Sequence, residues 1–143
     1  MLIQDYNCPI IDNGSFTWAE FTYLKGFKKF AVPFDEQEYQ NALFLFAQLE
    51  PLRKQLTFPL IITSGVRTAN YTQYLRKQGI PAAIHSAHNT WQAVDLICPK
   101  LSTSQLWRFF DTYWSGRMEL PHYTPSWVHI DTRSWGSHQR FIP

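Results

Sequence analysis

Residues 86–95 read Ser-Ala-His-Asn-Thr-Trp-Gln-Ala-Val-Asp, and residues 127–131 read Trp-Val-His-Ile-Asp. The first stretch places an imidazole and a carboxylate on either side of a short connection, and the second adds another imidazole. A catalytic zinc ion typically takes about three protein ligands and keeps its fourth position open. Taken singly, a loop histidine, a turn aspartate and a core histidine are ordinary. Taken together, His88, Asp95 and His129 predict one zinc ion per chain.

The residues around two of these candidates strengthen the prediction. Asp95 interrupts the apolar, strand-like run Ala93-Val94-Asp95-Leu96-Ile97, and a buried carboxylate without a partner is costly. Asp95 therefore needs a cation nearby. In residues 127–131, the alternation of a strand puts Trp127, His129 and Asp131 on one face. Asp131 is then placed to orient the imidazole of a metal-binding His129.

The order Ser-x-His, Ala-x-Asp and late His-x-Asp resembles the M15 zinc peptidases. These are D-alanyl-D-alanine carboxypeptidases and related phage and bacterial cell-wall peptidases, and they share their fold with the hedgehog signalling domain. The resemblance runs from about Phe16 to Arg133. It includes Thr63-Ser64-Gly65-Val66-Arg67-Thr68, which is similar to the family's Ser-Gly-Tyr-Arg turn.

This resemblance implies roles for several residues. It makes His88, Asp95 and His129 the zinc ligands. It makes Arg67 the group that binds the terminal carboxylate of the substrate or neighbouring peptide oxygens, a task that suits the fork of a guanidinium. Arg67 could instead be a structural arginine that holds the turn. Ser86 is implied as a hydrogen-bonding residue of the substrate site, and its alternative is a turn serine.

Two positions depart from the family pattern. Trp91 stands where glycine is common, so the backbone there either avoids a left-handed conformation or is held in one at a cost. Ser126 stands where the acidic general base is usual; a serine is too weak a base but could position a water. His122 is one candidate replacement for the base, since an imidazole titrates near neutrality, and its alternative is a solvated loop histidine. Asp131 is the other candidate, although its place on the face of His129 favours orienting that imidazole.

Composition and charge limit the remaining possibilities. The chain has 143 residues, 45% of them hydrophobic and 17% aromatic, which is enough for one domain over residues 1–143 with a substantial core. The net charge of +2 is too small to indicate nucleic acid. Cys8 and Cys98 could pair, and the sequence does not decide it. We find no secretory signal and no stretch that would insert into a membrane.

The pattern of caps and apolar runs predicts an α+β fold with a small, mainly antiparallel sheet that holds the metal on one face. Thr17 and Glu20 form a capping box for a helix that ends near Gly26. The other expected helices run from Asp35, with a kink or break at Pro51, from Thr68 to Gln78, and from Ser102 or Thr103 to about 115, with Leu106, Phe109, Phe110 and Tyr113 on the buried side. The expected strands cover 59–63, 93–97, 117–120 and 127–131.

These observations favour a monomeric zinc peptidase that hydrolyses a peptide bond next to a D-amino acid in peptidoglycan stem peptides, as a carboxypeptidase or an endopeptidase. The substrate follows from the resemblance alone. The alternative is a catalytically impaired binding or structural module, such as a phage virion component. A hedgehog-like signalling role is disfavoured. Without a signal peptide, the protein is expected to be made in the cytoplasm and to reach the wall after lysis, release or packaging in a virion.

Overall fold

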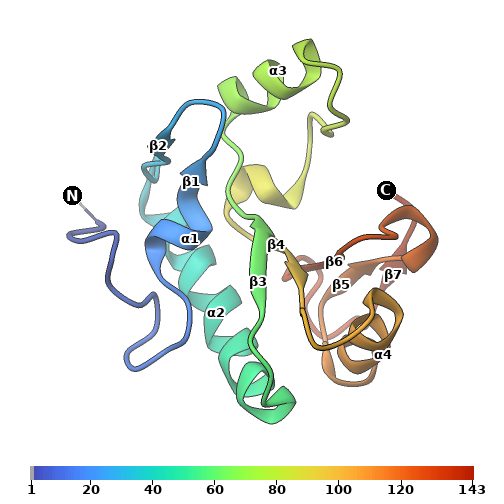
Figure 1. The fold of residues 1–143 in the computed structure, drawn as a ribbon. Helices are drawn as coiled ribbons and strands as arrows, with labels where there is room; N and C mark the ends of the chain where they lie inside the picture. Colours follow the sequence, from blue (N-terminus) through green and yellow to red (C-terminus); the bar gives the residue numbers. More distant parts are fainter. Residues whose placement is uncertain (1) are drawn as a thin grey trace.

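A five-stranded sheet lies at the centre of the computed structural model, which describes residues 2–143 (Figure 1). Its strand order is β3 (Ile61–Ser64), β4 (Ala93–Ile97), β6 (Val128–Asp131), β5 (Arg117–Glu119) and β7 (Arg140–Phe141). Neighbouring strands are antiparallel except β5 and β7, which are parallel. The expected α+β class with a mainly antiparallel sheet is confirmed.

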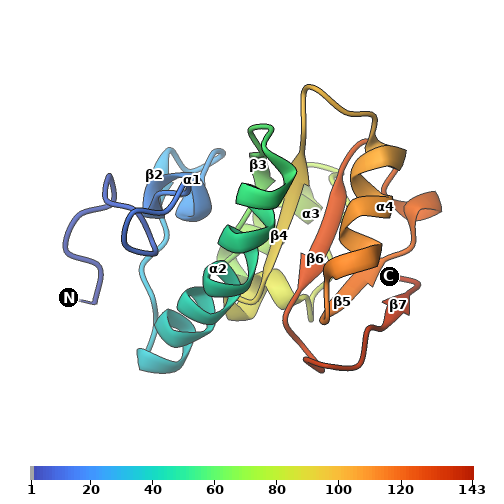
Figure 2. The same ribbon diagram turned by 90° about the horizontal axis from the view of Figure 1, so that it is seen from below.

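Four α-helices surround the sheet, namely α1 (Trp18–Thr22), α2 (Glu36–Leu56), α3 (Ala69–Lys77) and α4 (Thr103–Tyr113). Two short 3-10 helices, η1 (Ala87–Thr90) and η2 (Pro121–Tyr123), lie between strands. Helices α2 and α4 cover the same face of the sheet (Figure 2). Because side chains alternate along a strand, this packing leaves every second residue of β4 and β6 on the opposite face.

The core forms between the sheet and these two helices. From the central strands it takes Val94, Leu96, Val128 and Ile130, all fully buried, and from the helices it takes residues that include Leu45, Phe46, Leu49, Leu106 and Phe110. The alternate positions of the same strands carry Asp95 and His129. The apolar half of each strand therefore anchors the sheet, and the polar half is left to build a site.

The helix starts follow the expected caps. Thr17 and Glu20 form a capping box at α1, and the side chains of Asp35, Thr68 and Ser102 accept backbone N–H bonds at the starts of α2, α3 and α4. Each side chain satisfies an N–H that has no partner inside its helix. Residues 93–97, 117–119 and 128–131 form strands where strands were expected.

Several details of the expectation are wrong. Helix α1 ends at Thr22, because the chain turns there into a hairpin of two short strands, β1 (Tyr23–Leu24) and β2 (Lys29–Phe30). Of the kink or break expected at Pro51, the break is absent, because helix α2 continues through Pro51 to Leu56. Strand β7 was not expected. The side chain of Tyr113, expected in the core, is half exposed at the end of α4.

Cys8 is exposed and Cys98 is buried, and both are free thiols. Among residues 2–143, no helix has the length and apolar character needed to cross a bilayer.

Candidate metal centre

Three side chains from separate segments meet on the polar face of the central strands. Asp95 lies directly opposite His129 in the register between β4 and β6, and η1 brings His88 beside them. Asp95 Oδ1 lies 3.0 Å from His129 Nδ1 and 3.3 Å from His88 Nε2. One ligand atom from each residue lies within 4.8 Å of the others, and all three residues are buried. The structure thus brings the expected ligand set together.

In each imidazole, the nitrogen that points away from Asp95 donates a hydrogen bond to an oxygen of the protein. His88 Nδ1 donates to the Gly65 carbonyl at 2.6 Å, and His129 Nε2 donates to Asp131 Oδ2 at 2.9 Å. These bonds leave His88 Nε2 and His129 Nδ1 facing the Asp95 carboxylate. Metal-binding histidines usually have their other N–H held by a carbonyl or carboxylate in this way. Two nitrogens and one carboxylate oxygen fit a zinc ion with an open position.

The turn after β3 explains why Gly65 is present beside the cluster. Val66 N–H donates to the Phe21 carbonyl at 2.9 Å, which draws the backbone of the turn onto the end of α1. A Cβ at Gly65 would collide with that same carbonyl. Only glycine allows the two backbones to approach so closely. The turn can then hold its own carbonyl against the His88 ring.

Trp91 is held in the left-handed conformation that the family glycine would adopt easily. Its φ is 64° and its ψ is 29°, which costs free energy for a residue with a side chain. Its indole is 1% exposed and packs edge-on against Phe21 with ring centroids 5.9 Å apart. Core packing therefore compensates for the backbone strain, and the connection between His88 and Asp95 keeps its shape.

Contacts among the three side chains shift their pKa values. Burial would raise the pKa of Asp95, but the imidazoles of His88 and His129 lower it below its usual range. Burial would lower the pKa of His129, but hydrogen bonds to Asp131 and Asp95 raise it to about 9. Burial lowers the pKa of His88 despite the opposing charge of Asp95. A proton on the His129 imidazole would therefore balance the charge of Asp95 where no metal is bound.

The two expected substrate-binding residues lie at the edge of the cluster. Arg67 Nη2 lies 3.7 Å from Asp95 Oδ2 and donates to Ser64 Oγ at 3.1 Å. Ser86 precedes η1, where its Oγ accepts the His88 N–H at 3.2 Å, so it also serves as the turn serine that was its alternative. The positions of Arg67 and Ser86 suit substrate contact, and their roles stay predictions.

The two expected catalytic residues lie apart from the cluster. His122 is exposed on η2, where its ring packs against Tyr123, and Ser126 is exposed just before β6. Among the contacts of residues 2–143, none joins His122 or Ser126 to the three ligands. Their roles stay predictions, and the structure offers another carboxylate that is nearer.

Glu119 is the residue that the sequence reasoning missed. It ends β5, the strand next to β6, and its Oε1 lies 3.8 Å from His129 Nδ1. Its side chain is 18% exposed, and burial raises its pKa. The available signal was the alternation of residues 117–119, where Met118 is apolar and its two polar neighbours face the other way. Glu119 reaches His129 only because β5 lies beside β6, and the alternation of residues does not reveal which strands are neighbours.

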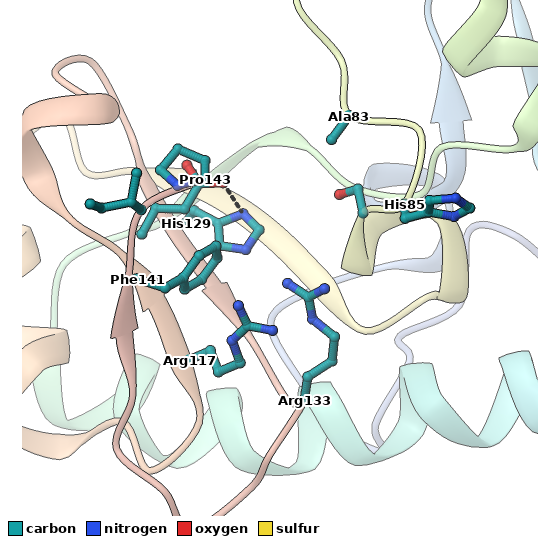
Figure 3. Close-up of a pocket in the computed structure, with 10 residues that line it drawn as sticks. Ala83, His85, Arg117, His129, Arg133, Phe141 and Pro143 are labelled. Carbon is teal, nitrogen blue, oxygen red and sulfur yellow. Dashed lines mark ion pairs between the residues drawn. The ribbon is translucent and has the colours of Figure 1, made fainter.

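A cavity of about 230 Å³ opens beside these residues (Figure 3). His129 and Glu119 form part of its wall, together with Ser86 from the loop that leads into η1. Arg117 of β5 and Phe141 of β7 also line the cavity, together with Arg133, which follows the end of β6. A ligand in this cavity would therefore contact one of the candidate metal ligands and a neighbouring carboxylate.

Comparison with known proteins identifies the family to which this arrangement belongs. The family model described as Peptidase M15 matches residues 15–131, a range that contains His88, Asp95, His129 and Glu119. Comparisons with curated proteins and with solved structures give no significant match. The family match covers most of the chain, and the chain therefore belongs to the M15 peptidases.

Proposed function

We propose that the protein is a zinc-dependent peptidase whose metal ligands are His88, Asp95 and His129. The observation that carries the proposal is the orientation of the two imidazoles. Each uses one nitrogen to bind a protein acceptor, Gly65 O or Asp131 Oδ2, and turns the other toward Asp95. A buried histidine with only a structural role does not require both nitrogens to be arranged in this way.

The proposed substrate is a stem peptide of peptidoglycan, cut at a bond next to a D-amino acid. The support for this substrate is the likeness of the ligand pattern to cell-wall peptidases of the M15 family. The cleavage could remove the last residue or open an internal bond. The small positive charge of the chain is compatible with a substrate that carries carboxylates.

The residues around the cluster supply the other parts of a hydrolytic mechanism. A zinc ion held by the three ligands would polarise the scissile carbonyl and lower the pKa of water toward about 7. Glu119 Oε1 is placed to accept a proton from the attacking water and to return it to the leaving amine nitrogen. Arg67, beside Asp95, would donate to an oxygen of the scissile peptide group.

The test is incubation of the purified protein with zinc and muropeptides, followed by mass spectrometry of the products. We expect cleavage that is lost on addition of a chelator and lost in His129→Ala. His138→Ala is the matched control, because His138 is an exposed histidine whose ring contacts Arg140, and this variant should cleave normally. Binding of muropeptides without cleavage would contradict the proposal and favour a binding module.

A further inference from the structure

Arg117 stands out in the wall of the cavity because no carboxylate in the described part of the chain forms an ion pair with it. Its guanidinium carbon lies 4.0 Å from the centroid of the Phe141 ring. Its Nε is enclosed and has no hydrogen-bond partner. An aromatic face compensates only in part for the water that a guanidinium loses. Because Arg117 lines the cavity, an anionic ligand bound there would supply the charge partner that the protein does not supply.

The two carboxylates that share the strand face of Arg117 already bind other partners. Asp131 is the cross-strand partner of Arg117 in the pairing of β5 with β6. However, its oxygens bind His129 Nε2 at 2.9 Å and the Arg133 side chain at 3.0 and 3.3 Å. Glu119 shares a strand face with Arg117, but its carboxylate turns toward His129 Nδ1. The fold therefore leaves Arg117 available to an anion from outside the chain.

Arg117 is also close to the candidate metal centre. The Phe141 ring that it covers lies 5.9 Å, centroid to centroid, from the His129 imidazole. Figure 3 shows Arg117, Phe141 and His129 grouped on the same side of the cavity. One aromatic ring thus separates the guanidinium from a metal ligand. An anion bound by Arg117 and a peptide group at the metal centre could therefore belong to adjacent residues of one substrate.

We propose that Arg117, supported by Phe141, binds a carboxylate of the peptide substrate next to the scissile bond. This inference rests on the proposed peptidase function and adds the chemistry of the substrate. It assigns the carboxylate to Arg117 rather than to Arg67, whose guanidinium already borders Asp95 and donates to Ser64. The carboxylate is either the C-terminus of the substrate or an acidic side chain beside the bond that is cut.

The test compares matched peptides that differ only in this carboxylate. One pair ends in D-alanyl-D-alanine with a free or an amidated C-terminus, and another carries glutamate or glutamine beside the scissile bond. For the zinc-bound wild type we expect KM to be about 10- to 100-fold lower for the acid member of one pair, the range expected for a charge-assisted hydrogen bond. Arg117→Gln should remove this preference, and Arg117→Lys should retain part of it.

The control is Arg108→Gln, which changes an exposed arginine on α4 and should keep the full preference. Zinc content and thermal melting show whether each variant is folded. Preference in the first pair would identify a terminal carboxylate, and preference in the second an acidic side chain. A preference unchanged in Arg117→Gln, or no preference in the wild type, would overturn the inference.

A binding measurement separates this inference from the peptidase proposal. Calorimetric titration of the same peptides into the zinc-bound protein reports carboxylate recognition even when no peptide is cut. Binding that depends on Arg117 without cleavage would support the subsite and contradict the peptidase. Cleavage in which Arg117→Gln keeps the preference for the acid peptide would support the peptidase and contradict the subsite.

Discussion

Two carboxylates with different environments lie beside His129 Nδ1, Asp95 from β4 and Glu119 from β5. Asp95 is nearly enclosed, and the two imidazoles lower its pKa. Glu119 is partly exposed in the cavity wall, and burial raises its pKa. A carboxylate with a lowered pKa stays ionised and suits a metal ligand, whereas a carboxylate with a raised pKa is the better proton acceptor. Environment thus assigns separate roles to two side chains of the same type.

The role of Glu119 predicts a specific loss in one variant. Glu119→Gln keeps the shape of the side chain and removes its ability to accept a proton. We expect kcat to fall by about 100-fold to 10,000-fold while zinc remains bound, since this is the usual contribution of a general base. Steady-state kinetics and zinc analysis of the same preparation measure the two effects.

Two comparisons make this prediction specific. Glu36→Gln changes an exposed glutamate that bonds to Gln40 on α2, and it should leave kcat unchanged. His122→Ala tests the sequence-based assignment of the base. A fall in kcat in His122→Ala as large as that in Glu119→Gln would indicate that His122 is the general base.

At the scale of secondary structure, the strands show what the sequence could and could not predict. The alternation in 127–131 placed His129 and Asp131 on one face, and their side chains are in contact. The apolar run around Asp95 likewise predicted β4. The strands of the β1–β2 hairpin and β7 have two residues each, which is too short for a periodic signal. A role for Glu119 could not be predicted, because its contact with His129 depends on which strands are neighbours in the sheet.

The turn between η1 and β4 allows a prediction about stability. Trp91→Gly would relieve the backbone strain of the left-handed conformation but would remove a buried indole that packs on Phe21. Deleting a buried tryptophan costs more than relief of strain returns. We expect the free energy of unfolding to fall by about 2–4 kcal/mol. Equilibrium unfolding in urea measures this change.

A contrary result would change the interpretation of this turn. A Trp91→Gly variant as stable as the wild type would mean that the conformation of residue 91, and not its packing, limits stability. Trp91→Phe, which keeps an aromatic ring and the backbone strain, should be more stable than Trp91→Gly if packing dominates.

For the molecule as a whole, folding assembles one cation-binding site from distant segments, and a proton can occupy it in place of a metal. The pKa of His129 is raised to about 9 by hydrogen bonds to Asp131 and Asp95 that outweigh burial. Below that pH, the imidazole of the metal-free protein is protonated. Zinc must displace this proton from Nδ1, so binding of the metal and loss of the proton are coupled.

This coupling predicts a pH dependence with a definite sign. Zinc affinity should increase as the pH rises from about 6 to about 8, by up to about tenfold per pH unit, and should level off above about pH 9, where no proton remains to be displaced. The pKa of His88 is lowered, so that residue should add little in this range. Competition against a chelator of known pH dependence measures the affinity. An affinity that is constant between about pH 6 and 8 would contradict the coupling.

The three converging side chains are expected to bind zinc through an Asp95 oxygen and the two imidazole nitrogens that face it. Diffraction from zinc-soaked crystals, recorded on both sides of the zinc absorption edge, tests it most directly. We expect one anomalous peak about 2.0–2.2 Å from His88 Nε2, His129 Nδ1 and an Asp95 oxygen, with His129 Nε2 still bound to Asp131. Zinc-soaked crystals with no peak at this position would contradict it.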